Sequence, residues 1–239
     1  MRSHQAGVTL MELLIAVTLL SLLSVGMLLA MRIGLMAYGK VQSKLMENRR
    51  VAGAQRILEE ELEGMMPVVA ACGAARAAFF QGEPQTMRLV STFSLDQAWR
   101  GQPQILEIFV ISGEEGRGVR LVVNEIPYTG PLGAGQLCSG RGTDLLTGIS
   151  VARFAPVTPG PRAFVLADQL AYCRFSYYTI PIDRSVPPHW TPNWTVDGWP
   201  FAVRVEMAPL DPDPSRLQPI TVTAPIHLHR SSEIPYGDY

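Results

Sequence analysis

The chain carries little charge and has no excess of either sign. Lys, Arg, Asp and Glu make up 17% of its 239 residues, and the formal net charge is −1. A nucleic-acid-binding domain needs a basic patch or stripe to contact the phosphate backbone. The near-neutral balance therefore predicts no nucleic-acid partner.

Cysteine is scarce as well, with only three residues in the chain. None of them form a Cys-x-x-Cys pair, which argues against a thiol-redox or zinc site. Three disulfide pairings are possible among Cys72, Cys138 and Cys173 if the domain lies in an oxidising compartment. We predict a bridge between Cys138 and Cys173, which would join a loop to a strand. Free buried thiols are the alternative.

The common signatures of catalysis and metal binding are missing too. No P-loop, Rossmann, nucleophile-elbow or kinase pattern occurs. The four histidines, His4, His189, His227 and His229, are too scattered for a zinc motif, and Asp211–Pro214 lacks the ligand spacing of a calcium loop. The sequence predicts a protein that is not an enzyme and that has no cofactor and no metal.

What the chain does have is a long apolar run near its N-terminus. Leu13–Met31 contains nineteen uncharged residues and directly follows Glu12. As a helix this run is about 28 Å long, close to the ~30 Å hydrocarbon core of a membrane. A secretory signal peptide with a small-x-small site at Ser24–Gly26 and a plain signal anchor are two interpretations. Neither explains Glu12, because a carboxylate costs roughly 2.5–3.5 kcal/mol at the centre of a membrane helix, and somewhat less near its end.

The residues in front of the run explain Glu12 through a resemblance. Gly-Val-Thr-Leu-Met-Glu at positions 7–12, behind a short leader containing Arg2, resembles the class III signal of type IV pilins and type II secretion pseudopilins. The resemblance implies that prepilin peptidase cuts after Gly7 and that the new N-terminus, Val8, is methylated. Val8 stands where the family most often has Phe. Glu12 would form the assembly ion pair with the amine of Val8 on a neighbouring subunit.

The apolar run is expected to continue as one long helix. No proline occurs between Arg32 and Met66, and Pro67 then disfavours continuation. The predicted helix runs from Thr9 to Met66. An apolar stripe marks its second half, and the acidic residues 59–63 are expected on the solvated flank. The stripe consists of Val41, Leu45, Ala52, Leu58, Leu62 and Met65.

The chain beyond Pro67 has the pattern of a β-rich domain. Segments rich in β-branched and aromatic residues alternate with Gly and Pro. We predict strands at Met87–Phe93, Ile105–Ile111, Val119–Ile126, Ala163–Leu166, Ala171–Ile180, Ala202–Met207 and Ile220–His229. Ile105–Ile111, with one charge, is predicted to be a central strand, Val68–Ala78 a short helix and Tyr128–Gly142 a long loop. One long helix followed by strands indicates an α+β fold with an antiparallel sheet, the pilin-like architecture.

These elements divide the chain into four predicted parts. Residues 1–7 form the leader peptide, 8–31 the transmembrane and filament-core helix, and 32–66 its amphipathic continuation. Residues 67–239 form a globular domain. The resemblance implies a single-pass protein of the bacterial inner membrane, with the leader in the cytoplasm and the domain in the periplasm.

A second resemblance, in the C-terminal part of the chain, narrows the predicted family. Phe175-Ser176-Tyr177, a Trp-bearing loop from His189 to Trp194, and the segment Gly198–Val205, in which Pro200 opens a strand, resemble the minor pseudopilins of the J type. That family implies partnership with I-type and K-type minor pseudopilins, the major pseudopilin and prepilin peptidase, and a structural role in starting or capping the pseudopilus.

Three other functions remain open at this stage. They are a minor pilin of a type IV pilus system, a single-span membrane-anchored binding domain, and a secreted hydrolase released by cleavage near Gly26. Trp190, Trp194 and Trp199 are either a binding patch or aromatic cover at the rim of a core.

Overall fold

The fold is taken from a computed structural model. It describes residues 9–73, 75–94, 99–143, 148, 150–161, 163–181, 185–210 and 219–228. Within helix α1 the side chains of residues 40–52 are not described. The chain divides into two compact units, Met1–Glu47 and Asn48–Tyr239, which are treated separately below.

Helix α1 spans Leu10–Glu63 and ends three residues before the predicted limit. Met65–Met66 leave the helix as strand β1 and pair with Ser91 and Val90 of strand β5. Gly64 makes the change of direction possible, because its carbonyl accepts the backbone N–H of Thr92 at 2.9 Å. A Cβ at Gly64 would lie 2.7 Å from the Ser91 hydroxyl, so only glycine fits this close approach. The strand pairing, and not Pro67, therefore ends the helix.

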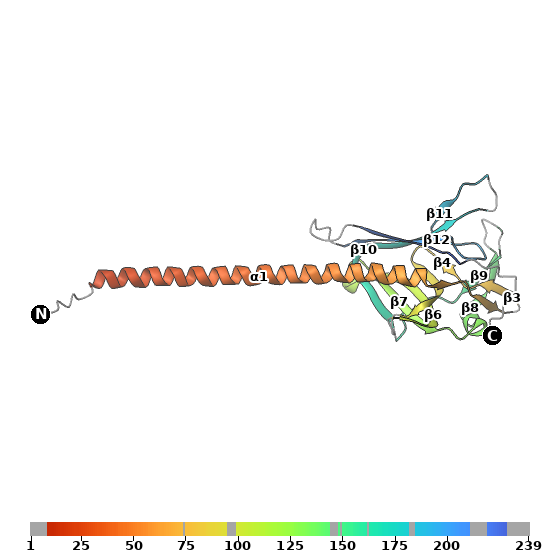
Figure 1. Cartoon of the computed structure of the whole chain (residues 1–239), viewed down its shortest axis with the longest axis horizontal. Helices are drawn as coiled ribbons and strands as arrows, with labels where there is room; N and C mark the ends of the chain where they lie inside the picture. The colour runs from red at the N-terminus through yellow and green to blue at the C-terminus, as the bar shows by residue number, and fades with distance from the viewer. Residues whose placement is uncertain are drawn as a thin grey trace. The chain divides into compact units, whose positions relative to one another are not determined.

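Among the described residues, the second unit is built on a nine-stranded antiparallel sheet in the order β1-β5-β6-β7-β10-β12-β13, with β4 beside β5 and β11 beside β10. Strands β6, β7, β10, β11 and β12 of this sheet are labelled in Figure 1. Its longer strands are β5 (Thr86–Ser94), β6 (Trp99–Ser112), β7 (Val119–Pro127), β10 (Ala163–Thr179), β12 (Ala202–Pro209) and β13 (Ile220–Pro225). Its two short additions are β4 (Gln81–Gly82) and β11 (His189–Thr191). The α+β fold with an antiparallel sheet is thus confirmed, and so is the central position of the strand over Ile105–Ile111, which lies within β6.

The two strands predicted at Ala163–Leu166 and Ala171–Ile180 are one strand, β10, in the structure. Its first half pairs with β7 and its second half with β12. The register shifts between Val165 and Leu170, and Gln169 has a φ of 53°. The interval between the two predicted strands is therefore an irregular stretch where β10 changes partners.

Two further local predictions are wrong. The segment predicted as a short helix, Val68–Ala78, forms strands β2 (Val69–Cys72) and β3 (Ala75–Ala78), which pair antiparallel. Gly73, with a φ of 66°, lies in the turn between them, where a helix would have required a negative φ.

The predicted loop Tyr128–Gly142 contains helix α2 (Pro131–Gly135) and most of strand β8 (Cys138–Thr143). Strand β8 pairs with β9 (Ser150–Phe154).

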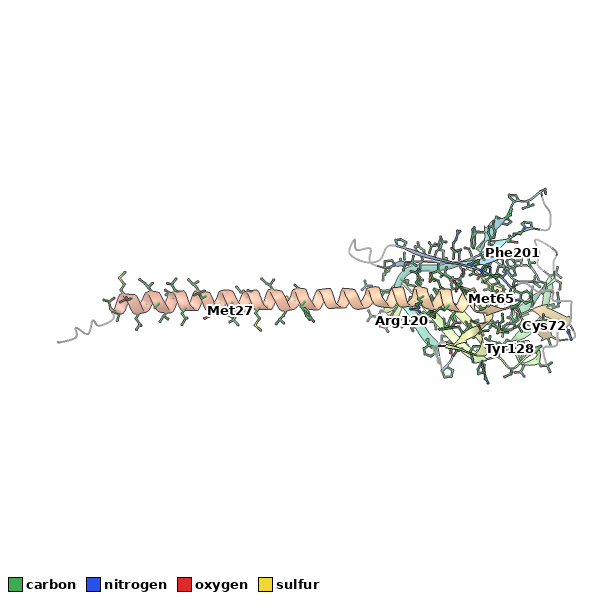
Figure 2. The ribbon with its side chains drawn as sticks, viewed as in Figure 1. Met27, Met65, Cys72, Arg120, Tyr128 and Phe201 are labelled. Carbon is green, nitrogen blue, oxygen red and sulfur yellow. A yellow bond between two sulfur atoms is a disulfide. The ribbon has the colours of Figure 1, made fainter. Side chains whose placement is uncertain are left out.

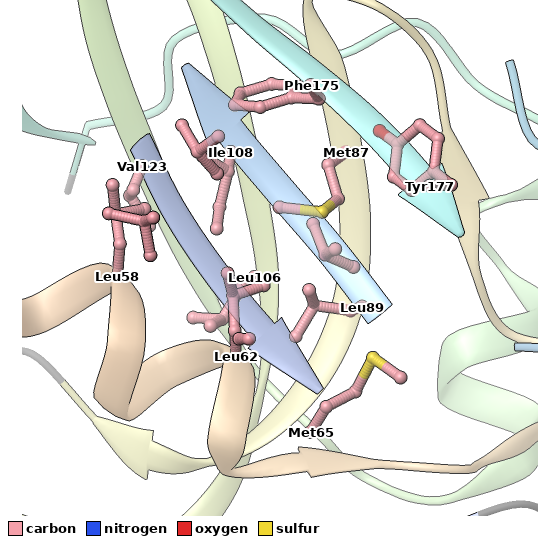
Figure 3. Close-up of a cluster of buried hydrophobic side chains, with 14 of the residues drawn as sticks. Leu58, Leu62, Met65, Met87, Leu89, Leu106, Ile108, Val123, Phe175 and Tyr177 are labelled. Carbon is pink, nitrogen blue, oxygen red and sulfur yellow. The ribbon is translucent and has the colours of Figure 1, made fainter. Parts of the chain in front are cut away.

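The sheet has a core on each face. On one face, Ala54, Leu58 and Leu62 of α1 pack against the sheet together with Met65 (Figure 3). The helix-side cluster also contains Met87, Leu89, Leu106, Ile108, Val123, Phe175, Tyr177, Val203, Val205 and Val222. The buried part of the predicted helical stripe is confirmed for Leu58 and Leu62, whereas Met65 is buried but lies in strand β1 and not on the helix. Val41, Leu45 and Ala52 lie outside the described side chains.

The second core lies on the opposite face of β5 and β6. Val90 and Ile105 pack there against Val68, Ala70 and Phe79. Strands β2, β3, β8 and β9 and helix α2 supply much of this cover. Successive residues of a strand point to opposite faces, so Ile105 and Leu106 belong to different cores.

Candidate functional site

Residues Leu10–Gly39 form an apolar helix, and the most apolar stretch of 18 residues within it has a mean hydropathy of 2.6. No part of its most apolar window is buried in the chain itself, and Met27 is 78% exposed (Figure 2). Thirty residues extend about 45 Å as a helix, which covers a bilayer including its headgroups. By length and composition this segment fits a single-pass membrane anchor.

The polar side chains inside this helix are satisfied locally. The hydroxyls of Thr18, Ser21 and Ser24 donate to backbone carbonyls three or four residues earlier, at 2.8–2.9 Å. These internal hydrogen bonds remove the cost of placing a hydroxyl in hydrocarbon. The helix is therefore compatible with a membrane despite its hydroxyl groups.

Glu12 is the charged residue at the start of this helix. It lies in the first turn of α1, where the N–H of Glu12 is 3.3 Å from the Thr9 hydroxyl and 3.1 Å from the Thr9 carbonyl. Thr9 is thus the N-cap, and Thr-x-x-Glu is the order of a capping box. A carboxylate in the first turn also interacts favourably with the helix dipole. The Glu12 side chain has no ion pair with any residue that the structure describes.

The predicted cleavage and methylation positions, Gly7 and Val8, lie outside the described residues. The same holds for His4, for His229 and for Asp211–Pro214. His189 and His227 are exposed. Among the described residues, no three His, Cys, Asp or Glu side chains gather closely enough to hold a metal ion.

The predicted bridge between Cys138 and Cys173 is wrong. Cys72 and Cys138 form the disulfide, with a Cα–Cα distance of 5.5 Å, and Cys173 is free and buried. Cys173 points into the helix-side core, whereas Cys72 and Cys138 lie at the core on the opposite face of the sheet. Burial raises the pKa of the Cys173 thiol to about 12, so it remains protonated and unreactive at neutral pH.

The three tryptophans of the predicted patch have separate roles. Trp199 is buried in the helix-side core, and Trp194 packs against that core while its Nε1 donates to the carbonyl of Gly198 at 3.0 Å. Both are core aromatics. Of the three, only Trp190 lies on the outer surface, where its ring contacts Tyr178 and Arg204.

A buried polar row crosses three strands, and nothing in the sequence pattern predicted it. Arg88, Glu107 and Asn124 are neighbours across β5, β6 and β7. Arg88 donates to Glu107 Oε1 through Nε at 2.9 Å and Nη2 at 2.7 Å, and Asn124 Nδ2 donates to Glu107 Oε2 at 2.8 Å. The row also binds the backbone of the covering segment at Ala155 and Thr158, beside a pocket of about 340 Å³. Because these groups satisfy one another, the row stabilises the fold and leaves no group free for chemistry.

Glu61 is a second buried polar residue, and its predicted place on the solvated flank is wrong. It has no exposed surface, and neither carboxylate oxygen has a hydrogen-bond partner of standard geometry among the described residues. Burial raises the pKa of Glu61 to about 8; a weak contact with the Ser91 hydroxyl opposes this, and Glu125 and Glu60 add to it. Glu61 lies three residues after Leu58, so helical spacing alone could have placed it on the buried face.

Residues 2–28 match the family described as the prokaryotic N-terminal methylation motif. The matched segment includes the predicted cleavage position, Glu12 and most of the apolar run. A search of curated proteins found no match to the chain.

Proposed function

We propose that this chain, whose methylation motif indicates a type IV pilin-like protein, is a minor pseudopilin of the J type in a type II secretion system. Its role is structural: it helps to start or cap the pseudopilus. The observation that carries the proposal is the methylation motif leading into an apolar helix that the chain does not bury.

The proposed mechanism begins with processing. Prepilin peptidase removes residues 1–7, and the new amine of Val8 is methylated. The apolar segment that follows the cleavage position, up to Met31, then lies in the inner membrane until it is drawn into the filament. Residues from Arg32 onward continue the helix to its last residue, Glu63. The domain that follows lies in the periplasm.

Glu12 then couples processing to assembly. Its carboxylate has no cationic partner among the described residues, and an unpaired charge in an apolar environment is costly. Cleavage creates a positive charge at Val8 of each subunit. An ion pair between this amine and Glu12 of a neighbour satisfies both groups inside a bundle of packed helices.

Two features of the second unit support the proposed location and type. The Cys72–Cys138 disulfide is typical of proteins outside the cytoplasm. The residues that resemble the J type also lie together: Phe175 and Tyr177 of β10, Val203 and Val205 of β12, and Trp199 all belong to the helix-side core. The residues that carry the J-type resemblance therefore include a group that packs together in one region of the domain.

The proposal makes a test of processing possible. Full-length protein extracted from its native membrane should have an intact mass that begins at a methylated Val8. Replacing Gly7 with a bulky residue, such as Gly7→Leu, should leave the leader attached. A mature protein that begins at Met27, or one that retains Met1, would refute the pilin-like mechanism.

A second test addresses the J type and its partners. The purified full-length chain should co-elute in detergent with the I-type and K-type minor pseudopilins of the same organism, with masses measured by light scattering. A specific contact of this kind buries at least about 1,000 Å². Correct processing combined with no heteromer at tens of micromolar would instead assign the chain to a type IV pilus as a minor pilin.

A further inference from the structure

One face of the β10–β12–β13 region is open to solvent. Buried residues alternate along these strands with exposed ones, so that Phe175, Val205 and Val222 face the helix-side core. The residues between them point the other way, and Arg174, Thr221 and Thr223 are exposed. On the same face of the sheet, β5 and β6 are covered by β2, β3, β8, β9 and α2. Among the described residues, this cover packs on β5 and β6 and not on β12 and β13.

Trp190 and Arg204 form a stacked pair on this open face. The guanidinium carbon of Arg204 lies 3.9 Å from the centre of the Trp190 ring, and Tyr178 contacts the same Trp ring with centroids 5.2 Å apart. A guanidinium held over an aromatic ring is partly pre-oriented, so its N–H groups can bind a carboxylate with a smaller loss of side-chain entropy.

Arg174 repeats this arrangement on the neighbouring strand. Its guanidinium carbon lies 5.3 Å from the centre of the Tyr172 ring. Arg174 is opposite Glu206 in the register of β10 and β12, and Ser176 is opposite Arg204, so the two arginines are diagonal neighbours. We call Tyr172, Arg174, Tyr178, Trp190 and Arg204 the arginine–aromatic face.

Neither arginine is ion-paired with a residue in the described part of the chain. By contrast, Arg56, Arg88, Arg120 and Arg141 each have a carboxylate within 4.0 Å. The Nε of Arg204 is enclosed and has no hydrogen-bond partner there. The stacking therefore orders these two cations without neutralising them.

We propose that the arginine–aromatic face binds an acidic segment of another protein, with its carboxylates on Arg174 and Arg204. Charge complementarity selects the carboxylates, and Tyr, Trp and Arg are the residue types that dominate binding energy at protein interfaces. Glu206 on the same face would repel a dense anionic surface such as a phospholipid membrane, whereas a protein segment can place a donor opposite it. The inference depends on the second unit alone and holds for any secretion or pilus system.

Photo-crosslinking of the full-length chain in its native membrane tests this inference. Thr223 is opposite Arg204 on β13 and is exposed, so Thr223→p-benzoylphenylalanine places the crosslinker beside the face. We expect a protein adduct whose crosslinked peptide, identified by mass spectrometry, contains at least two Asp or Glu residues. The adduct should weaken as the salt concentration rises.

Matched variants distinguish binding at the arginine–aromatic face from a general effect of the positive charge of the chain. Arg174→Gln combined with Arg204→Gln should lower the adduct yield roughly tenfold, the effect of removing interface hot spots. Arg117→Gln removes another exposed positive charge, at the β6–β7 turn away from this face, and should leave the yield unchanged. Arg204→Lys keeps the charge but loses the planar fork, so it should also lower the yield.

Three results would overturn the inference: an adduct to phospholipid in place of protein, no adduct at all, or a protein adduct with the same yield in the double variant. Circular dichroism of each variant verifies that its fold is intact. Because the crosslink does not depend on leader cleavage, this result is independent of the processing test.

Discussion

Replacing the buried Glu61 with glutamine should stabilise the protein at neutral pH. Glu61 has no exposed surface, and burial raises its pKa from an ordinary 4.5 to about 8. Between these two pH values the unfolded chain releases the proton while the folded chain keeps it. The folded state therefore loses stability as the pH rises through this window. The contribution is present in full below about pH 4.5 and is lost as the pH rises through about 8.

The size of the effect follows from the width of this window. At pH 7 the unfolded carboxyl is about 2.5 pH units above its pKa, and each unit corresponds to about 1.4 kcal/mol, so the wild type is destabilised by about 3 kcal/mol relative to acid pH. Glu61→Gln removes the titration and keeps the shape of the side chain. The variant should exceed the wild type by about 2–3 kcal/mol at pH 7, and the difference should shrink towards zero near pH 4.5.

Urea unfolding of the full-length chain in detergent micelles, followed by tryptophan fluorescence at several pH values, measures this difference. Glu63→Gln is the matched control, because Glu63 lies two residues away but is exposed, and its substitution should have little effect at any pH. The groups that face Glu61 are Ser91, Glu125 and Glu60. Glu125→Gln should therefore lower the pKa of Glu61 and move the transition to lower pH. A stability difference between Glu61→Gln and wild type that does not change from pH 4.5 to pH 8 would refute the reasoning.

The remaining predictions concern the disulfide and the buried polar row. Non-reducing peptide mapping should recover Cys72 linked to Cys138 and Cys173 protected from alkylation until the protein unfolds; a linked Cys138–Cys173 peptide would contradict the structure. Reduction should cost up to about 4 kcal/mol of unfolding free energy, measured by denaturation with and without reductant, because the bridge closes a loop of 66 residues. Glu107→Gln should cost about 3–5 kcal/mol in urea unfolding, since it leaves the buried Arg88 without its counter-charge; a loss below about 1 kcal/mol would show that the pair is not desolvated.

The helix over the apolar run could be predicted from local sequence because its signals are local. An apolar run of membrane length, the absence of proline and a Thr-x-x-Glu start act within a few helical turns, so the helix over the apolar run was predicted within one residue of its start at Leu10. Its end at Glu63 was not predicted, because Met65 leaves the helix to pair with Ser91. Whether Met65 continues the helix or joins the sheet depends on a strand more than twenty residues away.

The strands beyond Pro67 were largely predictable, whereas their partners were not. β-Branched and aromatic runs indicate where strands lie, but small apolar residues such as those of Val68–Ala78 suit helices and strands alike. The turn at Gly73 and the burial of both strands of the hairpin decided between them. Similarly, the polar interruption in β10 became an irregular stretch because β7 and β12 pair with different halves of one strand.

Local sequence patterns are sufficient to predict the membrane-length helix, the acidic residue in its first turn, the α+β class and the presence of a β-rich domain. The pairing of the cysteines, the burial of Glu61 and the contact between Trp190 and Arg204 on an open face depend on how distant segments pack together. The first group depends on contacts within a few residues, which composition and periodicity record. The second depends on which face of the sheet each side chain occupies and what packs against it, and that is fixed by strand order and register across the whole chain.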